Sequence, residues 1–220
     1  MNEIFITADT HFAHDVNKYG FGGIIRFGKR PFSSIKEHDE YIINRWNETV
    51  GKKDLTYICG DFAWRDHAHY IHALNGKKIL ITGSHDKMPQ AVLRLFSEVH
   101  NGMLIRVIKK VKFVFTHCAL LVWEGSHYNI SINCHGHSHM RLEEFDTIRR
   151  MDVGIDGAIN YSPWNIDFIL YKMSLKKKRE VDPRNEEALA RRMTVNRENN
   201  IKLYDQWTKE TMASSSAGGC

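Results

Sequence analysis

Short apolar runs alternate with polar and glycine-containing segments along the first hundred residues. Most of these runs are typical of short buried strands, whereas the segment behind Ser34 repeats its apolar residues near helical period. Ser34 and Glu37 have capping-box spacing, and Gly51 follows as a stop signal. Four glycines and a proline predict a loop over 15–32. We expect strands at 4–8, 55–59 and 78–82, and helices at 35–50, 67–74 and 90–96.

The second half of the chain leaves little room for helices between its apolar runs. Residues 103–108 and 111–116 are separated by two residues, which predicts an antiparallel hairpin. Further strands are expected at 130–134, 151–155 and 167–171. Strand–helix alternation followed by strand pairs favours an α/β fold, a two-sheet β-sandwich flanked by helices.

The pattern predicts one domain over residues 1–175 and a C-terminal extension over 176–220. Asp182-Pro183 opens the last segment, which has helical and small polar stretches. Within the extension we expect helices at 186–192 and 201–209 and disorder at 214–219.

The composition is that of an ordinary globular protein. Hydrophobic residues make up 42% of the chain and charged residues 26%, which excludes wholesale disorder. The longest apolar runs, such as 111–115, are too short to span a bilayer, and residues 1–7 do not resemble a secretory signal. The four cysteines show no CxxC spacing, so neither a disulfide scaffold nor a cysteine zinc site is indicated. We therefore expect a cytoplasmic protein with no membrane partner.

The net charge of +5 is unevenly distributed. Residues 176–220 hold ten Lys and Arg and seven Asp and Glu, a net +3, so residues 1–175 carry only +2. A basic tail can attract an anionic partner such as nucleic acid, but a solvated helix face is the favoured interpretation.

Acidic and imidazole side chains follow five of the expected strands. Ligands in open α/β sheets collect at the carboxyl ends of strands, and alternate residues of an extended chain point the same way. Asp9 and His11 can therefore converge, as can His137 and His139. The five motifs are Asp9-Thr10-His11, Gly60-Asp61, Gly83-Ser84-His85-Asp86, Thr116-His117 and Gly136-His137-Ser138-His139.

A mixed set of carboxylates and imidazoles suits manganese, zinc, iron or nickel better than calcium or magnesium. The set contains more ligands than one ion needs, and a carboxylate such as Asp61 can bridge two metals about 3.5–4 Å apart. Glycines next to the ligands let the backbone turn sharply and approach an ion closely.

In their order, the motifs resemble the calcineurin-like metallophosphoesterases, whose pattern is DxH, GD, GNHD or GNHE, H and GHxH. The resemblance covers roughly residues 3–172, and both order and strand context agree. The opening Thr7–His14 and the later Asn160–Pro163 look like small bacterial and phage members, which implies the cytoplasm of a bacterial or host cell.

The resemblance also implies a dinuclear site and a role for each motif residue. His85 would stabilise the substrate phosphate and protonate the leaving group, and Asp86 would orient that imidazole. A water bridging the two metals would be the nucleophile. By position, Asp9, His11 and His139 would hold the first metal, Ser84, His117 and His137 the second, and Asp61 would bridge both.

The sequence departs from the family pattern at Ser84, where the family has Asn. A serine hydroxyl reaches less far than an amide carbonyl, so we expect a weaker second metal site. Arg65 follows the GD motif, and it either binds a substrate phosphate or pairs with Asp66 at the surface.

Three further residues are candidates for substrate contact. His14 lies three residues after His11 in the same loop. Trp123 and Tyr128 lie between two ligand-bearing strands and either stack on a nucleobase or pack in the protein.

Three functions stay open. The leading one is a metal-dependent phosphoesterase, with manganese as the preferred metal, acting on a nucleotide-like phosphodiester or phosphomonoester. The second is a nuclease on single-stranded or short nucleic acid, which the nearly neutral main body disfavours. The third is a catalytically weakened metal-binding scaffold, which the retention of His85 and of six of the seven ligands disfavours.

Overall fold

The structure is a computed structural model that describes residues 2–15, 23–143, 145 and 147–176, together with 191, 194–195, 197–199, 201–202 and 204. The chain divides into two compact units, Met1–Lys178 and Arg179–Cys220. In the second unit the described residues are helical, while most of 186–192 and 201–209 and all of 214–219 lie outside the described residues. No helix in the described part of the chain is both long and apolar enough to cross a membrane.

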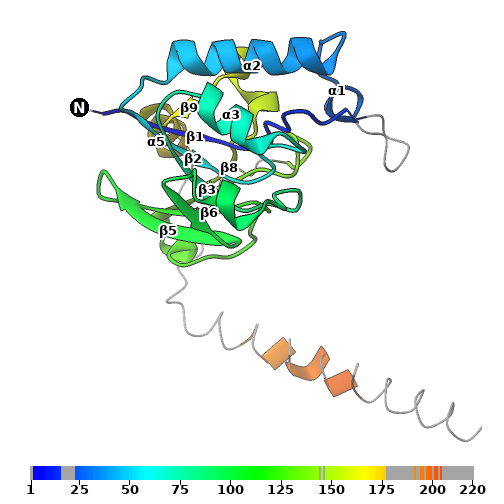
Figure 1. Ribbon diagram of the computed structural model, residues 1–220. Coiled ribbons are helices and arrows are strands. Elements are labelled where there is room, and N and C mark those ends of the chain that lie inside the picture. The colour runs from blue at the N-terminus through cyan, green and yellow to red at the C-terminus, as the bar shows by residue number, and fades with distance from the viewer. Residues whose placement is uncertain are drawn as a thin grey trace, which may run out of the picture. The chain divides into compact units, whose positions relative to one another are not determined.

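The first sheet has five strands in the order β4-β3-β2-β1-β9. Its first four strands along the chain run parallel, and β9 pairs antiparallel with β1 (Figure 1). The bounds are Ile4–Thr7 for β1, Leu55–Ile58 for β2, Lys77–Ile81 for β3, Glu98–His100 for β4 and Trp164–Asn165 for β9.

The second sheet has four strands in the order β5-β6-β7-β8. β5 and β6 form the predicted antiparallel hairpin, with Met103 opposite Thr116 and Ile108 opposite Val111, and β6, β7 and β8 run parallel. The bounds are Met103–Ile108 for β5, Val111–Thr116 for β6, Ser131–His135 for β7 and Arg150–Asp152 for β8.

The two sheets enclose one apolar cluster, and helices cover the other face of the first sheet. The inner cluster includes Ile6 of β1, Ile79 of β3 and Phe115 of β6, all buried. A second cluster joins the outer face of the first sheet to α2 and α3, which lie above it in Figure 1, through residues such as Trp46 and Ile71. The predicted α/β fold of two sheets flanked by helices is therefore confirmed.

Most helices match the pattern that predicted them. Ser34 caps α2, and its hydroxyl accepts the backbone N–H of Glu37 as the capping box requires. The expected loop at 15–32 contains a short helix, α1, that its glycines concealed. The bounds are Gly23–Phe27 for α1, Ile35–Thr49 for α2, His67–Ala73 for α3 and Gln90–Leu93 for α4, and short 3₁₀ turns cover Ser126–Tyr128, Ile155–Gly157 and Ile159–Tyr161.

The strand predicted at 167–171 is wrong, because these residues belong to helix α5, Ile166–Ser174. Asn165 caps this helix, and its side chain accepts the backbone N–H of Asp167 at 2.8 Å. Ile166, Ile169 and Met173 are buried in the cluster between the sheets, a spacing that follows helical period. A short apolar run does not distinguish a strand from a buried helix, which explains the error.

Replacing the cap residue tests this assignment of α5. Asn165→Ala removes the acceptor for the Asp167 N–H and is expected to lower the free energy of unfolding by about 1 kcal/mol. Urea unfolding measures the loss. Asn165→Ser, which keeps a capping oxygen, should stay within about 0.5 kcal/mol of the parent protein, and an equal loss in both variants would contradict the capping role.

Candidate metal centre

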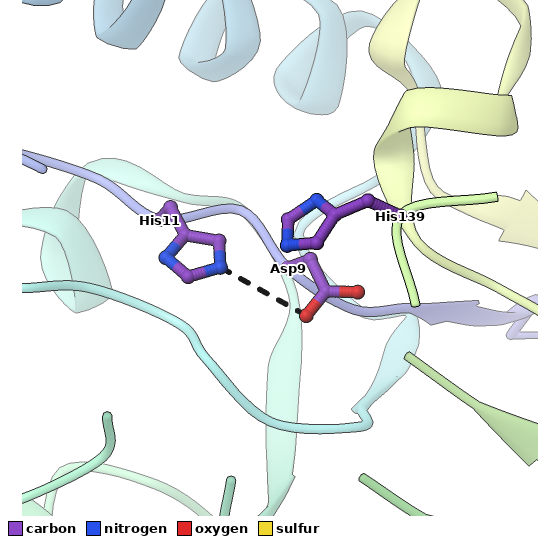
Figure 2. A group of neighbouring side chains, drawn as sticks. All are labelled: Asp9, His11 and His139. Atoms are coloured by element: carbon purple, nitrogen blue, oxygen red, sulfur yellow. Dashed lines mark ion pairs between the residues drawn. The ribbon is translucent and has the colours of Figure 1, made fainter. Parts of the chain in front are cut away.

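Asp9 and His11, which follow β1, meet His139, which follows β7 (Figure 2). One ligand atom from each of the three lies within 4.8 Å of the others. His11 Nε2 is 4.0 Å from Asp9 Oδ1, and both atoms are buried without a hydrogen-bond partner. Buried polar atoms of this kind normally have a partner, so their convergence fits a cation bound between them.

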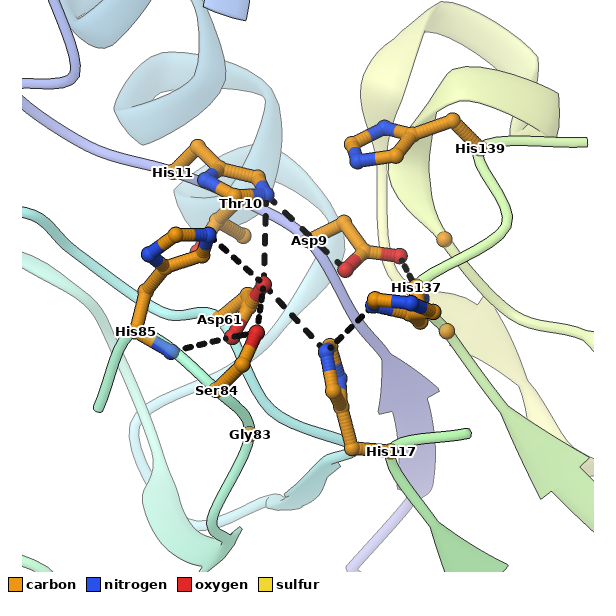
Figure 3. Close-up of polar contacts among 12 residues, drawn as sticks. Asp9, Thr10, His11, Asp61, Gly83, Ser84, His85, His117, His137 and His139 are labelled. Atoms are coloured by element: carbon orange, nitrogen blue, oxygen red, sulfur yellow. Dashed lines mark hydrogen bonds and ion pairs between the residues drawn. The ribbon is translucent and has the colours of Figure 1, made fainter. Parts of the chain in front are cut away.

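Asp61, His117 and His137 form a second group of convergent ligand atoms (Figure 3). His117 Nε2 is 3.2 Å from Asp61 Oδ2 and 3.2 Å from His137 Nδ1. The other ring nitrogen of His117 lies 2.9 Å from the carbonyl oxygen of Cys59, which leaves Nε2 for a ligand. Two nitrogen donors and a carboxylate around one point suit a divalent transition metal.

Asp61 stands between the two groups. Its Oδ2 lies 3.2 Å from His117 Nε2 of its own group and 3.7 Å from His11 Nε2 of the first group (Figure 3). The parallel pairing of β1 with β2 produces this proximity, since the N–H of Asp9 bonds the carbonyl of Gly60 at 3.0 Å. The carboxylate is therefore placed to serve both groups.

The backbone adopts left-handed conformations at five of the six candidate ligand residues, with His117 the exception. Such φ values are uncommon outside glycine and cluster at functional sites. The ligand residues with positive φ are Asp9 at 56°, His11 at 50°, Asp61 at 53°, His137 at 69° and His139 at 47°.

Two glycines in the motifs are required by close packing against the carboxylates. A Cβ at Gly83 would lie 2.4 Å from Asp61 Oδ1, and a Cβ at Gly136 would lie 2.6 Å from Asp9 Oδ2. At both positions glycine lets the backbone lie close to a ligand carboxylate.

Arg30 and Asp156 support the first group and were missed in the sequence. Asp156 Oδ2 lies 2.7 Å from His139 Nδ1, so this carboxylate orients the imidazole with Nε2 free. Arg30, buried at 3% exposure, pairs with both oxygens of Asp156 and donates to the carbonyls of Asp9 and Thr10. Asp156 follows β8 as Asp61 follows β2, so the strand-end rule could have found it, whereas nothing local marks Arg30.

The protonation of the site follows from burial and from the neighbouring charges. Burial acts to lower the pKa of His117, but the Asp61 carboxylate outweighs it and raises this pKa to about 9. In turn, the hydrogen bond to His117 lowers the pKa of Asp61 against the opposing effect of burial. Burial raises the pKa of Asp9 well above its usual range and lowers that of His11 well below it.

Ser84 and His85 lie on the open side of Asp61. Ser84 Oγ is 3.4 Å from each oxygen of Asp61, and the backbone N–H of His85 donates to Asp61 Oδ1 at 2.9 Å. The side chain of His85 is 34% exposed, with Nε2 3.8 Å from Asp61 Oδ2. Both residues therefore lie beside the second group, at the rim of the site.

Asp86 has a different position from the one expected. Its carboxylate accepts the backbone N–H groups of Asp61, Phe62 and Gly83, each at 2.8 Å. No hydrogen bond joins it to His85 among the contacts of the described residues. Because its oxygens are used in joining two motif loops, the prediction that Asp86 orients the His85 imidazole is corrected: it braces the backbone of the site instead.

Of the candidates for substrate contact, His14 lies next to the centre and Arg65 is engaged elsewhere. His14 Nδ1 is 3.1 Å from His11 Nδ1, and its ring lies 5.8 Å from that of His85. Arg65 instead forms two 2.8 Å hydrogen bonds to Asp15 and lies 4.0 Å from Asp66. The surface-pair interpretation of Arg65 is therefore the one observed, with Asp15 as the main partner.

Trp123 does not present a face for stacking. It is 7% exposed, and its indole N–H donates to Ser131 Oγ at 2.9 Å on β7. The nucleobase interpretation of this residue is corrected to packing. Tyr128 is 62% exposed in the turn Ser126–Tyr128, and no ring contact to a motif residue is found for it within the described chain.

Comparison with known proteins finds relatives without an assigned activity. No protein-family model matches the chain. It is 29% identical over 183 residues to the uncharacterized protein MJ1445 of Methanocaldococcus jannaschii, covering 77% of this chain and 90% of that protein. It is 26% identical over 193 residues to the gene 66 protein of Mycobacterium phage L5, covering 71% and 87%.

Among solved structures, the chain shares its fold with AQ665, a protein of unknown function from Aquifex aeolicus. The TM-score is 0.59 at 20% identity, over 78% of this chain and all of that one. Lower scores are found for Vps29 of Chaetomium thermophilum, with TM-score 0.41, 11% identity and coverage of 72% and 75%, and for a predicted phosphoesterase of Streptococcus pneumoniae, with TM-score 0.34, 14% identity and coverage of 62% and 62%.

Loading the protein with Zn²⁺ at pH 7 is expected to release protons. His117 has a pKa of about 9 in the metal-free site and must lose its proton to bind through Nε2. Below that pH, the affinity of the second group should rise about tenfold per pH unit, and above it the affinity should level off. Calorimetry in buffers of different ionisation enthalpy measures the release. His72→Asn, an exposed change on α3, should leave the release unchanged, whereas equal release in His117→Asn would contradict the assignment.

The serine in the third motif is expected to weaken the second metal site. Ser84→Asn supplies a carbonyl oxygen near Asp61 and should tighten the weaker of two bound ions on the order of tenfold. Metal content after buffer exchange, together with competition against a chelator, measures the gain. Ser84→Leu introduces a side chain similar in shape to asparagine but without the oxygen, and it should show no gain in metal affinity. Two tightly held ions in the parent protein would contradict the prediction.

Proposed function

We propose that this protein is a metal-dependent phosphoesterase that hydrolyses a phosphodiester or phosphomonoester bond. One observation carries the proposal: two groups of carboxylate and imidazole donors lie side by side with Asp61 between them. This arrangement suits two divalent ions about 3.5–4 Å apart, the geometry of many phosphoester hydrolases. The resemblance of the five motifs to the calcineurin-like metallophosphoesterases supports the same activity.

Each of the two groups holds one divalent ion in this proposal, and Asp61 is shared. The four imidazoles and two carboxylates favour a transition metal over calcium or magnesium. Manganese is the metal we propose first, and zinc, iron and nickel fit the same donors. Bound ions would lower the pKa of a coordinated water and offset the negative charge of the phosphate.

His85 is the residue that we assign to the substrate phosphate. Its imidazole is partly exposed beside Asp61, while its backbone is held to the Asp61 carboxylate. From this rim it can donate a hydrogen bond to a phosphoryl oxygen and pass a proton to the leaving oxygen. Arg30 and Asp156 act behind the site, where they hold Asp9 and His139 in place.

A nucleotide-like substrate remains part of the proposal, with Trp64 in the place first given to Trp123. Trp64 is half-buried, and its ring centroid lies 5.1 Å from that of His85. An aromatic ring next to the residue that contacts the phosphate suits a flat group attached to the ester.

The test offers manganese-loaded protein an aryl phosphodiester, an aryl phosphomonoester and single-stranded DNA. We expect turnover of one or both aryl esters, and a loss of about 10²–10⁴-fold in kcat for His85→Ala. His72→Asn, an exposed change on α3, is the control and should keep full activity.

The remaining outcomes separate the other functions. Cleavage of DNA that falls when residues 176–220 are deleted would assign a nuclease. No turnover of any substrate with any metal, restored by Ser84→Asn, would favour a catalytically weakened metal-binding scaffold. Full activity after treatment with a chelator would refute the proposal.

A further inference from the structure

The candidate ligand imidazoles differ in what contacts the ring nitrogen turned away from the site. His139 Nδ1 faces the Asp156 carboxylate at 2.7 Å, and His117 Nδ1 faces the Cys59 carbonyl at 2.9 Å. Both partners can only accept a hydrogen bond, so each fixes its imidazole with the proton on Nδ1 and with Nε2 free for a metal. His11 is the exception, because its Nδ1 faces another imidazole nitrogen, Nδ1 of His14, at 3.1 Å.

The proton between these two nitrogens can be assigned from the geometry of the site. His11 Nε2 is the atom that converges with Asp9 Oδ1 and Asp61 Oδ2, and it has no hydrogen-bond partner. An imidazole that binds a metal through Nε2 carries its proton on Nδ1. His11 therefore donates from Nδ1, and His14 must accept at Nδ1 and carry its own proton on Nε2.

His14 is held in place for this contact. Its ring stacks on Trp64 with centroids 4.5 Å apart and planes 4° apart. Its backbone N–H donates to the carbonyl of His11 at 3.2 Å, and its carbonyl accepts from the N–H of Ile24 at 3.0 Å. Trp64 is fixed in turn by a 2.8 Å hydrogen bond from its backbone N–H to the backbone carbonyl of Phe12.

We propose that His14 is a positioning residue of the metal centre: its Nδ1 accepts the Nδ1–H of His11 and thereby holds His11 Nε2 toward Asp9 and Asp61. This inference rests on the metal site that the proposed function uses. The role that a carboxylate fills behind His139 is filled behind His11 by an uncharged acceptor, braced by an indole ring. Second-sphere partners of this kind typically change metal affinity by about 10–100-fold when removed.

Three substitutions separate the acceptor from the ring. His14→Asn places an amide oxygen directly after Cγ, at the position that Nδ1 occupies in histidine. This variant keeps the hydrogen-bond acceptor and loses the ring. His14→Phe keeps a ring to stack on Trp64 and removes both nitrogens. His14→Gln moves the amide one bond further out, toward the position of Nε2.

Calorimetric titration with Zn²⁺ measures the effect on the full-length protein. We expect His14→Phe and His14→Gln to weaken one of the bound ions about 10–100-fold, and His14→Asn to remain within about threefold of the parent protein. Equal affinity in all variants, or an equal loss in all three, would overturn the proposal. Circular dichroism checks that each variant is folded, and the Asn-to-Gln comparison alone suffices if the Phe variant is not.

Long-range ¹H–¹⁵N spectra of the zinc-loaded protein read the tautomers directly. We expect His11 protonated on Nδ1 and His14 protonated on Nε2, and a His14 protonated on Nδ1 would refute the proposal. The result is separable from the proposed function. If the metal affinities and tautomers are as expected but the protein hydrolyses no ester, the inference stands and the proposed function is refuted. If the protein hydrolyses esters but the affinities and tautomers differ from those expected, the function stands and the inference is refuted.

Discussion

The close approach of two buried carboxylates, Asp9 and Asp61, is the constraint on which the rest of the site depends. They follow neighbouring parallel strands, so the sheet itself brings them together, and both are almost fully buried. Two carboxylates removed from water need compensating positive charge or donors. The convergence of imidazole nitrogens on the same space, with Asp9 Oδ1 and His11 Nε2 unpartnered, indicates that cations supply this compensation at the front of the site.

The protein supplies a different compensation at the back. The Arg30 guanidinium binds the carbonyls of Asp9 and Thr10 and the carboxylate of Asp156. It therefore stabilises the left-handed turn after β1 and, through Asp156, the orientation of His139. Asp86 stabilises the turns that follow β2 and β3 in a similar way, because its oxygens accept three backbone N–H groups there. Hydrogen bonds with these two charged residues stabilise the backbone at Asp9 and Asp61, whose left-handed φ angles are costly without such bonds.

Prediction from sequence succeeded where the functional residues lie close together in the sequence, directly after a predicted strand. Each of the five motifs follows a strand that the apolar pattern revealed, and parallel strands bring their carboxyl ends to one edge. The prediction failed where a partner lies far along the chain. Arg30 and Asp156 are 126 residues apart in sequence, and only the folded chain brings them together. The helix at α5 was missed for a related reason: its apolar residues fit either period, and the capping contact from Asn165 decides between them.

The expectation for Asp86 was wrong, and for Arg65 and Trp123 the interpretation without a substrate contact is the one observed. The three residues share a cause: in each case a partner in the site was considered for a side chain near a motif in sequence, although a nearer group was available. Asp86 finds backbone N–H groups, Arg65 finds Asp15, and Trp123 finds Ser131. A donor or acceptor that can bond the protein's own groups on folding is no longer free for a ligand, because burial without a partner is costly. Asp9 Oδ1 and His11 Nε2 are the reverse case: they are buried beside many possible partners and still have none. Where two such atoms converge, as these do at 4.0 Å, they identify a ligand site better than nearness to a motif does.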